Sequence, residues 1–139
     1  MNRLMIRLIA AFSILLLSST AFAEADFPAF WTKFQAAVVA GDKSVLAEMT
    51  KFPLSTPSGQ KTVKDKADFL RRYNQIFNGE ANAAQCFANA KPKKESARAY
   101  EVYCPFKQTP NDLENTPIRF YFELTNAGWK FAGLDNINE

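Results

Sequence analysis

Apolar positions recur every three or four residues in the segment 27–41, which is the spacing of one face of a helix. The stripe consists of Phe27, Phe30, Trp31, Phe34 and Val38. Asp26 stands before the stripe, where a side chain can cap a helix, and Gly41 stands where a helix can end. The pattern predicts a first helix ending at Gly41.

Two further helices are expected before residue 80. Asp42 caps a short second helix, which Pro53 prevents from extending. Residues 52–63 are expected to form a short strand pair or an extended arm. A third helix follows, capped by Asp65 and ended by Gly79. Its apolar stripe contains Phe69, Leu70, Tyr73, Ile76 and Phe77.

From residue 84 onward the apolar positions alternate with polar ones, as in strands. Four strands are predicted, over residues 84–91, 97–107, 117–125 and 129–134. The clearest alternation sets Ile118, Phe120, Phe122 and Leu124 against Arg119, Tyr121, Glu123 and Thr125. This pattern is typical of a sheet that is covered on one face only. The segregation of helices and strands predicts an α+β domain, with three N-terminal helices packed on an antiparallel sheet of about four to six strands.

The first 23 residues have the form of a cleaved secretion signal. Arg3 and Arg7 precede the apolar run 8–17, and Ala21 and Ala23 supply small side chains for a peptidase. We expect cleavage after Ala23, a mature single domain over residues 24–139, and a periplasmic or secreted location. The alternative is an uncleaved anchor. Cleavage leaves 15 basic and 14 acidic residues, a balance that does not favour a nucleic-acid partner.

The two cysteines, Cys86 and Cys104, are expected to form a disulfide, because an exported chain matures in an oxidising compartment. Two free thiols are the alternative. If the two cysteines face each other on antiparallel strands, the hairpin is centred on residue 95, in the turn-like run 91–96. This register places Ala88 opposite Val102 and Ala90 opposite Tyr100.

The chain contains no histidine, so a Ser-His-Asp or Cys-His arrangement is excluded within it. No metal and no cofactor are expected. An acid–base pair of carboxylate and tyrosine remains open. The carboxylates considered for it are Asp68, Glu101 and Glu123, and the tyrosines are Tyr73, Tyr100, Tyr103 and Tyr121. Each carboxylate also has a structural interpretation: Asp68 completes a helix cap, and Glu101 and Glu123 lie on solvated strand faces.

The order of elements resembles the nuclear transport factor two-like (NTF2-like) superfamily, which includes ketosteroid isomerase-like and SnoaL-like proteins. The segments that carry the resemblance are 40–42, 52–54, 62–70, 120–123 and 128–131. The resemblance implies a strongly curved, cone-like sheet with a pocket between sheet and helices. A cystatin-like domain with a helix on a sheet is the structural alternative.

The residues expected to contact a ligand or partner fall into two groups. Tyr73 and Tyr100 would line the cone pocket, or else fill the core. Arg119, Tyr121 and Glu123 would contact a partner or a second copy of the chain on the outer sheet face, or else form an ordinary solvated face. We therefore expect a non-catalytic exported domain that binds a small apolar ligand or an envelope protein, with homodimerisation through the sheet as one form of binding. The alternative is an isomerase- or hydratase-like enzyme with a buried carboxylate and a tyrosine in the pocket.

Overall fold

The structure is a computed structural model, and it describes residues 27–139. The predicted signal peptide, residues 1–23, lies outside the described residues. Among residues 27–139, no helix is long and apolar enough to cross a membrane.

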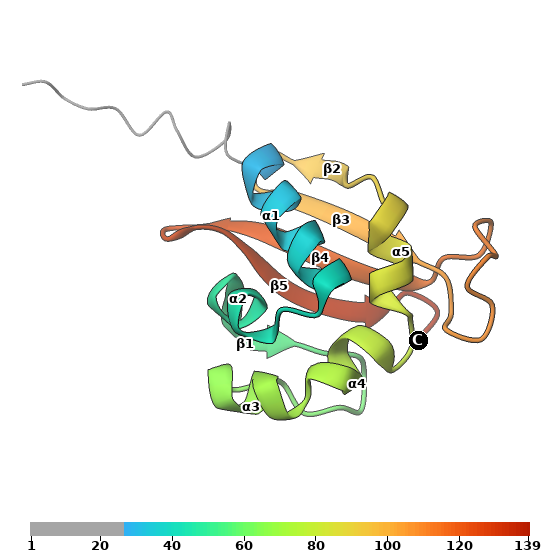
Figure 1. The fold of residues 1–139 in the computed structure, drawn as a ribbon, viewed down its shortest axis with the longest axis horizontal. Coiled ribbons are helices and arrows are strands. Elements are labelled where there is room, and N and C mark those ends of the chain that lie inside the picture. Colours follow the sequence, from blue (N-terminus) through green and yellow to red (C-terminus); the bar gives the residue numbers. More distant parts are fainter. Residues whose placement is uncertain (1–26) are drawn as a thin grey trace, which may run out of the picture.

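The described chain forms its helices mostly before its strands, with one strand between the second and third helices, as expected for an α+β domain (Figure 1). The helices are α1 (Phe27–Ala40), α2 (Lys43–Glu48), α3 (Lys66–Arg71), α4 (Tyr73–Asn78) and α5 (Ala83–Asn89). The strands are β1 (Thr50–Ser55), β2 (Lys93–Ser96), β3 (Ala99–Cys104), β4 (Ile118–Thr125) and β5 (Gly128–Asn136).

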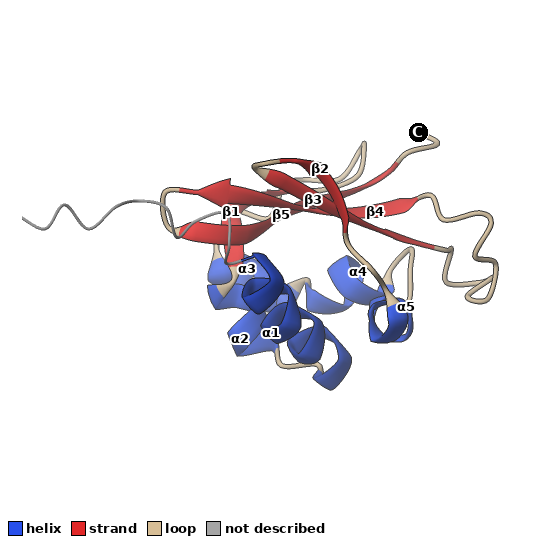
Figure 2. Cartoon of the chain, turned by 90° about the horizontal axis from the view of Figure 1, so that it is seen from above, coloured by secondary structure: helices blue, strands red, loops and turns tan. Residues whose placement is uncertain are grey.

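The five strands form one curved sheet in the order β1-β5-β4-β3-β2. Strand β1 runs parallel to β5, and the other pairs are antiparallel. The expectation of a wholly antiparallel sheet was therefore wrong at this edge. A parallel pair needs a long crossover, and the whole chain between β1 and β5 supplies it. Figure 2 shows the helices gathered on one face of the sheet, while the other face carries none.

The core lies between the helices and the covered face of the sheet. The predicted alternation in β4 is confirmed, because its apolar residues are buried and the residues between them are half-buried. The core is dominated by phenylalanine rings with at most 2% of their surface exposed. The six fully buried phenylalanines are Phe34, Phe69, Phe87, Phe120, Phe122 and Phe131.

The segment predicted as the first strand, residues 84–91, is mostly helix α5, so that prediction was wrong. Asn82 caps the helix by accepting a hydrogen bond from the backbone N–H of Gln85 at 3.2 Å. Ala83 and Phe87, four residues apart, are both buried. The alternation that suggested a strand consisted largely of alanines, which favour helices and are depleted in strands.

The hairpin register built on the cysteines was also wrong. Strand β2 occupies the run expected to be the turn, and Lys94 rather than Ala90 lies opposite Tyr100. Ala88 lies in α5 and has no place opposite Val102. The disulfide itself is confirmed, with Sγ atoms 2.01 Å apart and Cα atoms 5.8 Å apart. It joins helix α5 to strand β3 instead of two neighbouring strands.

The remaining differences concern the helix count and the edges of the sheet. Five helices are described where three were expected: α5 is new, and the predicted third helix is divided at Arg72 into α3 and α4. The expected strand or arm over residues 52–63 is found as β1 and a bridge between Leu54 and Val63, whose backbones exchange hydrogen bonds of 2.8 and 3.0 Å. The opposite edge is β2, four exposed residues long.

Candidate functional site

The helix-free face of the sheet is the surface on which most of the predicted site residues meet. Arg119, Tyr121 and Glu123 alternate along β4 and project to this face, as expected. The register of β4 with its neighbours places Tyr103 opposite Arg119 on one side and Asp135 opposite it on the other. We call the group of Glu101, Tyr103, Arg119, Tyr121 and Asp135 the sheet-face cluster.

Arg119 is the centre of this cluster. Its Nε and Nη2 donate to the two carboxylate oxygens of Asp135, the first at 3.0 Å. Its Nη1 donates to Oε1 of Glu101 at 2.9 Å. The hydrogen bonds to Asp135, followed by the charges of Asp135 and Glu101, raise the pKa of the Arg119 guanidinium above its ordinary value, against the opposing effect of burial. The guanidinium is thus a fixed positive charge held between two carboxylates.

Glu101 is buried, with 6% of its surface exposed, although it projects from the helix-free face. The expectation that it lies on a solvated face was wrong, because Arg119 and Tyr103 enclose it. The Tyr103 hydroxyl donates to Oε2 of Glu101 at 2.6 Å, so both carboxylate oxygens accept a hydrogen bond. This hydrogen bond, with burial, raises the pKa of Tyr103 and keeps the phenol protonated.

Tyr121 and Glu123 continue the face toward β5 and β1. The Arg119 guanidinium carbon lies 5.3 Å from the centre of the Tyr121 ring, a cation–π contact. Glu123 pairs with Lys51 at 3.0 Å, with both side chains more than 40% exposed. Glu123 therefore lies on a solvated part of the face, as expected. Lys130 donates to the backbone carbonyl of Glu48 at 2.8 Å.

Tyr73 and Tyr100, the other two predicted contact residues, do not join this face. The Tyr100 ring stacks on Phe27 with centroids 3.6 Å apart, on the covered side of the sheet. Tyr73 is buried against Phe69 and Phe77, and Lys43 lies over its ring. Both residues fill the core, which was the alternative interpretation.

Three members of the cluster were missed as contact residues: Glu101, Tyr103 and Asp135. Glu101 and Tyr103 had been considered only as acid–base candidates, and Asp135 had not been considered. The signal that could have found them is their alternation with buried residues on β3 and β5, combined with Arg119 on the strand between. Using that signal requires knowing that β3 pairs with β4, and the incorrect register drawn from the cysteines paired residues 97–107 with residues 84–91 instead.

The space inside the domain, where the resemblance implied a pocket, is occupied by aromatic rings. Phe122, for example, lies within about 6 Å, centroid to centroid, of Phe34 and Phe131. A small cavity of about 10 Å³ lies beside α4 and has room for roughly one water molecule. An apolar ligand of ordinary size needs a pocket of ~300 Å³ or more, so this cavity cannot take one.

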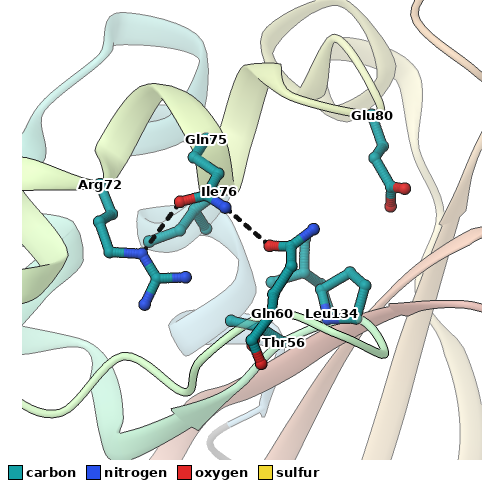
Figure 3. A pocket seen from close by; sticks show the side chains of 8 residues that line it. Thr56, Gln60, Arg72, Gln75, Ile76, Glu80 and Leu134 are labelled. Atoms are coloured by element: carbon teal, nitrogen blue, oxygen red, sulfur yellow. Dashed lines mark hydrogen bonds between the residues drawn. The ribbon is translucent and has the colours of Figure 1, made fainter.

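Glu80 is the acidic residue of this small cavity, and Arg72 is the basic one (Figure 3). One of its carboxylate oxygens is buried without a hydrogen-bond partner, and burial, followed by the charge of Glu139, raises its pKa. Gln60 accepts from Gln75 at 2.8 Å, and Gln75 in turn accepts from Arg72 at 3.0 Å, as the dashed lines in Figure 3 show. No tyrosine lines the cavity, so the pair of carboxylate and phenol that the alternative enzyme hypothesis requires is not found there.

Asp68 has the structural role that was considered for it. Its Oδ2 accepts from the backbone N–H of Lys64 at 3.0 Å, and Arg71 donates to Oδ1 at 2.9 Å. The backbone hydrogen bond is the larger cause of a pKa below the ordinary value. A carboxylate stabilised in its charged form is a poor proton donor or acceptor near neutral pH. Among residues 27–139, no group of three acidic or cysteine side chains is placed to hold a metal ion.

Comparison with known proteins gives similarity to solved structures only. No family model matches the chain, and no curated protein matches it. A ketosteroid isomerase-like protein from Erwinia carotovora is 16% identical, with coverage of 83% of this chain and 95% of that one and a TM-score of 0.46. A hexachlorocyclohexane dehydrochlorinase from Novosphingobium barchaimii is 16% identical, covering 82% and 84% with a TM-score of 0.44.

A third match, an NTF2-like protein with a cystatin-like fold from Novosphingobium aromaticivorans, is 14% identical, covering 83% and 80% with a TM-score of 0.42. These names agree with the predicted resemblance. The dehydrochlorinase and isomerase-like names stay with the proteins that bear them.

Proposed function

We propose that this protein is exported to an oxidising compartment and acts there as a non-catalytic binding domain, which contacts a partner protein through the helix-free face of its sheet. The observation that carries the proposal is the sheet-face cluster, in which Arg119 is fixed between Asp135 and Glu101 on an uncovered surface. Because hydrogen bonds already hold these side chains in place, they lose little conformational freedom when a partner binds.

The composition of the face supports binding to a protein. Tyrosine and arginine are enriched among the residues that dominate protein interfaces. Tyr103, Tyr121 and Arg119 are all half-buried on this face, so their rings and guanidinium remain accessible. The filled core favours surface binding over an apolar ligand inside the domain.

Export is supported by the disulfide between Cys86 and Cys104, since such bonds persist mainly in oxidising compartments. The test is to express the full chain in a bacterial host and to measure the intact mass of the protein in the periplasmic fraction. We expect the mass of residues 24–139 with one disulfide. A full-length mass, or a chain confined to the cytosol, would contradict export.

Partner binding is tested by photo-crosslinking in cells that export the protein. A photoreactive p-benzoylphenylalanine replaces Glu123 on the sheet face, and in a matched control it replaces Lys33 on the exposed side of α1. We expect a discrete crosslinked species from position 123 that is not obtained from position 33. Mass spectrometry then identifies the partner as a second copy or as another protein. No discrete species from position 123, or the same species from both positions, would refute the proposal.

One contact favours the second candidate, an isomerase- or hydratase-like enzyme: the buried Glu101 lies against the Tyr103 hydroxyl. We rank it lower, because both oxygens of Glu101 are already occupied and the pKa of Tyr103 is moved away from neutrality. Titration of ¹³Cζ-labelled tyrosine by NMR separates the two. A Tyr103 that titrates near neutral pH would favour the enzyme, and one that titrates above the ordinary tyrosine value would favour the binding domain.

A further inference from the structure

A surface hollow of about 320 Å³ lies between helix α5 and the segment 105–117, outside the core and apart from Arg119. In Figure 1 this segment, in orange, extends from the end of the sheet on the same side as α5. The residues that line the hollow are Gln85, Cys86, Asn89, Ala90, Tyr103, Pro105, Pro110, Asn111 and Leu113. Its volume is at the lower end of the ~300–1,000 Å³ range of small-molecule sites.

The walls of the hollow are held in place by covalent and hydrogen bonds. The disulfide fixes α5 against β3 on one side. The segment 105–117 is folded by consecutive turns, in which Thr109 and Asp112 donate backbone hydrogen bonds to Phe106 and Thr109. Gln85 approaches Asn111 at 3.5 Å and so spans the two walls. A site that is formed before its ligand arrives loses less entropy on binding.

The chemistry of the lining is apolar and uncharged. Cys86, Ala90, Pro105 and Pro110 present carbon and sulfur, and Leu113 is 78% exposed. The polar groups that the lining can offer are the carboxamides of Gln85, Asn89 and Asn111, since the hydroxyl of Tyr103 already donates to Glu101. Carboxamides both donate and accept hydrogen bonds but carry no charge. A lining without a charged side chain favours a neutral ligand, since a buried unpaired charge is costly.

An extended peptide is a poor fit to the same place. A peptide adds to a sheet through the free backbone groups of an edge strand. Strand β2 pairs with β3 only as far as Glu101, so the edge of β3 after Glu101 has no neighbouring strand on that side. The Sγ of Cys86 in α5, however, lies 3.7 Å from the carbonyl oxygen of Tyr103 on this edge. Helix α5 therefore occupies the edge that a strand would need.

We propose that this hollow is a binding site for a small neutral molecule with an apolar ring and one hydrogen-bonding group, about the size of a substituted phenol. The apolar part packs against the two prolines and Leu113, and the polar group bonds to the carboxamides at the rim. The proposal does not depend on partner binding at the sheet face, because Tyr103 is the only residue of the lining that belongs to the sheet-face cluster, and the other contacts come from residues 85–90 and the segment 105–117.

The test uses the mature, oxidised protein, residues 24–139, and p-cresol as the probe, followed by ¹H–¹⁵N NMR. We expect saturable shifts of the side-chain amide signals of Gln85, Asn89 and Asn111. 4-Methylbenzoate has nearly the same shape but carries a charge, and it should bind about ten-fold more weakly, a difference of ~1.4 kcal/mol. Equal binding of the two probes, or no saturable shift with p-cresol, would overturn the proposal.

Variants locate the site. Leu113→Ala should weaken p-cresol binding several-fold, whereas Ile137→Ala, which removes another exposed aliphatic side chain (53% exposed, against 78% for Leu113) outside the hollow, should leave it unchanged. Ala90→Phe should abolish binding by filling the hollow. If the spectrum of the Ala90→Phe protein shows misfolding, the comparison of the Leu113 and Ile137 variants decides. Equal binding by those two variants would refute the site.

Discussion

Tyr121 on β4 lies directly over Gly133 on β5, the residue paired with it across the strands. A β-carbon at Gly133 would collide with the hydroxyl and ring of Tyr121 and would come within 2.9 Å of the Ser55 β-carbon. Glycine at this position therefore lets the ring lie flat on the sheet, where it reaches the Arg119 guanidinium.

Gly133→Ala should force the Tyr121 ring away and lower the free energy of unfolding by about 1–3 kcal/mol, the usual cost of overpacking. Urea denaturation measures the change. In a Tyr121→Ala background the same substitution should cost less, because only the contact with Ser55 remains. An equal cost in both backgrounds would show that Tyr121 does not constrain Gly133.

Arg119→Met should be strongly destabilising, because it leaves the buried Glu101 and the half-buried Asp135 without their cation. We expect a loss of about 2–3 kcal/mol, below the ~3–5 kcal/mol of a fully buried pair, since Arg119 is 31% exposed. Glu123→Gln breaks the exposed pair with Lys51 and should change stability by less than ~1 kcal/mol. Chemical denaturation of both variants provides the comparison, and similar losses would contradict the assigned burial.

Cys86→Ser should lower stability by about 3 kcal/mol in the chain-entropy model, since the bond spans 18 residues. For a domain of this size that corresponds to a fall in Tm of at least ~10 °C. Thermal unfolding by circular dichroism tests this. Dithiothreitol should lower the Tm of the parent protein similarly and have no effect on the variant. A variant that melts with the parent would mean that the bond adds no stability.

Glu80 should make stability depend on pH. Its pKa in the folded protein is raised above the ordinary value near 4.5, so the folded state holds its proton more tightly than the unfolded state does. Stability contributed by this group therefore falls as pH rises from about 4.5 through the raised pKa, and the loss is complete above it.

Glu80→Gln removes this dependence, so its Tm relative to the parent should increase between pH 4 and pH 7. Glu114→Gln, which alters an exposed carboxyl in the segment 105–117, is the matched control and should run parallel to the parent. A Glu80→Gln protein whose Tm difference from the parent is constant over this pH range would show that burial does not affect the carboxyl.

The parts of the fold that were predictable from the sequence are those with a strong period. The stripe of α1 and the alternation of Phe120 and Phe122 with Arg119 and Tyr121 predict their elements correctly, because large side chains mark the buried face clearly. The strand predicted in place of helix α5 was wrong because alanine is small enough to suit either period, and its preference for helices prevails there over the alternation.

The candidate site was predictable only in part, for a related reason. Arg119, Tyr121 and Glu123 share one strand, so their common face follows from alternation alone. Glu101, Tyr103 and Asp135 lie on neighbouring strands, and their approach to Arg119 depends on register. The disulfide pairing was predicted correctly but the register drawn from it was not, because a disulfide brings two residues together without stating which elements carry them.

The two edge strands of the sheet affect how the protein behaves at high concentration. In β1, Pro53 has no N–H to offer, and Leu54 is already bonded to Val63. At the other edge, β2 is four residues long and exposes the charged residues Lys93, Lys94 and Glu95. Proline, charge and brevity are the features that protect border strands against edge-to-edge aggregation. Fibril growth by strand stacking is thus disfavoured in the folded state, so a concentrated solution of the folded chain should resist this form of association.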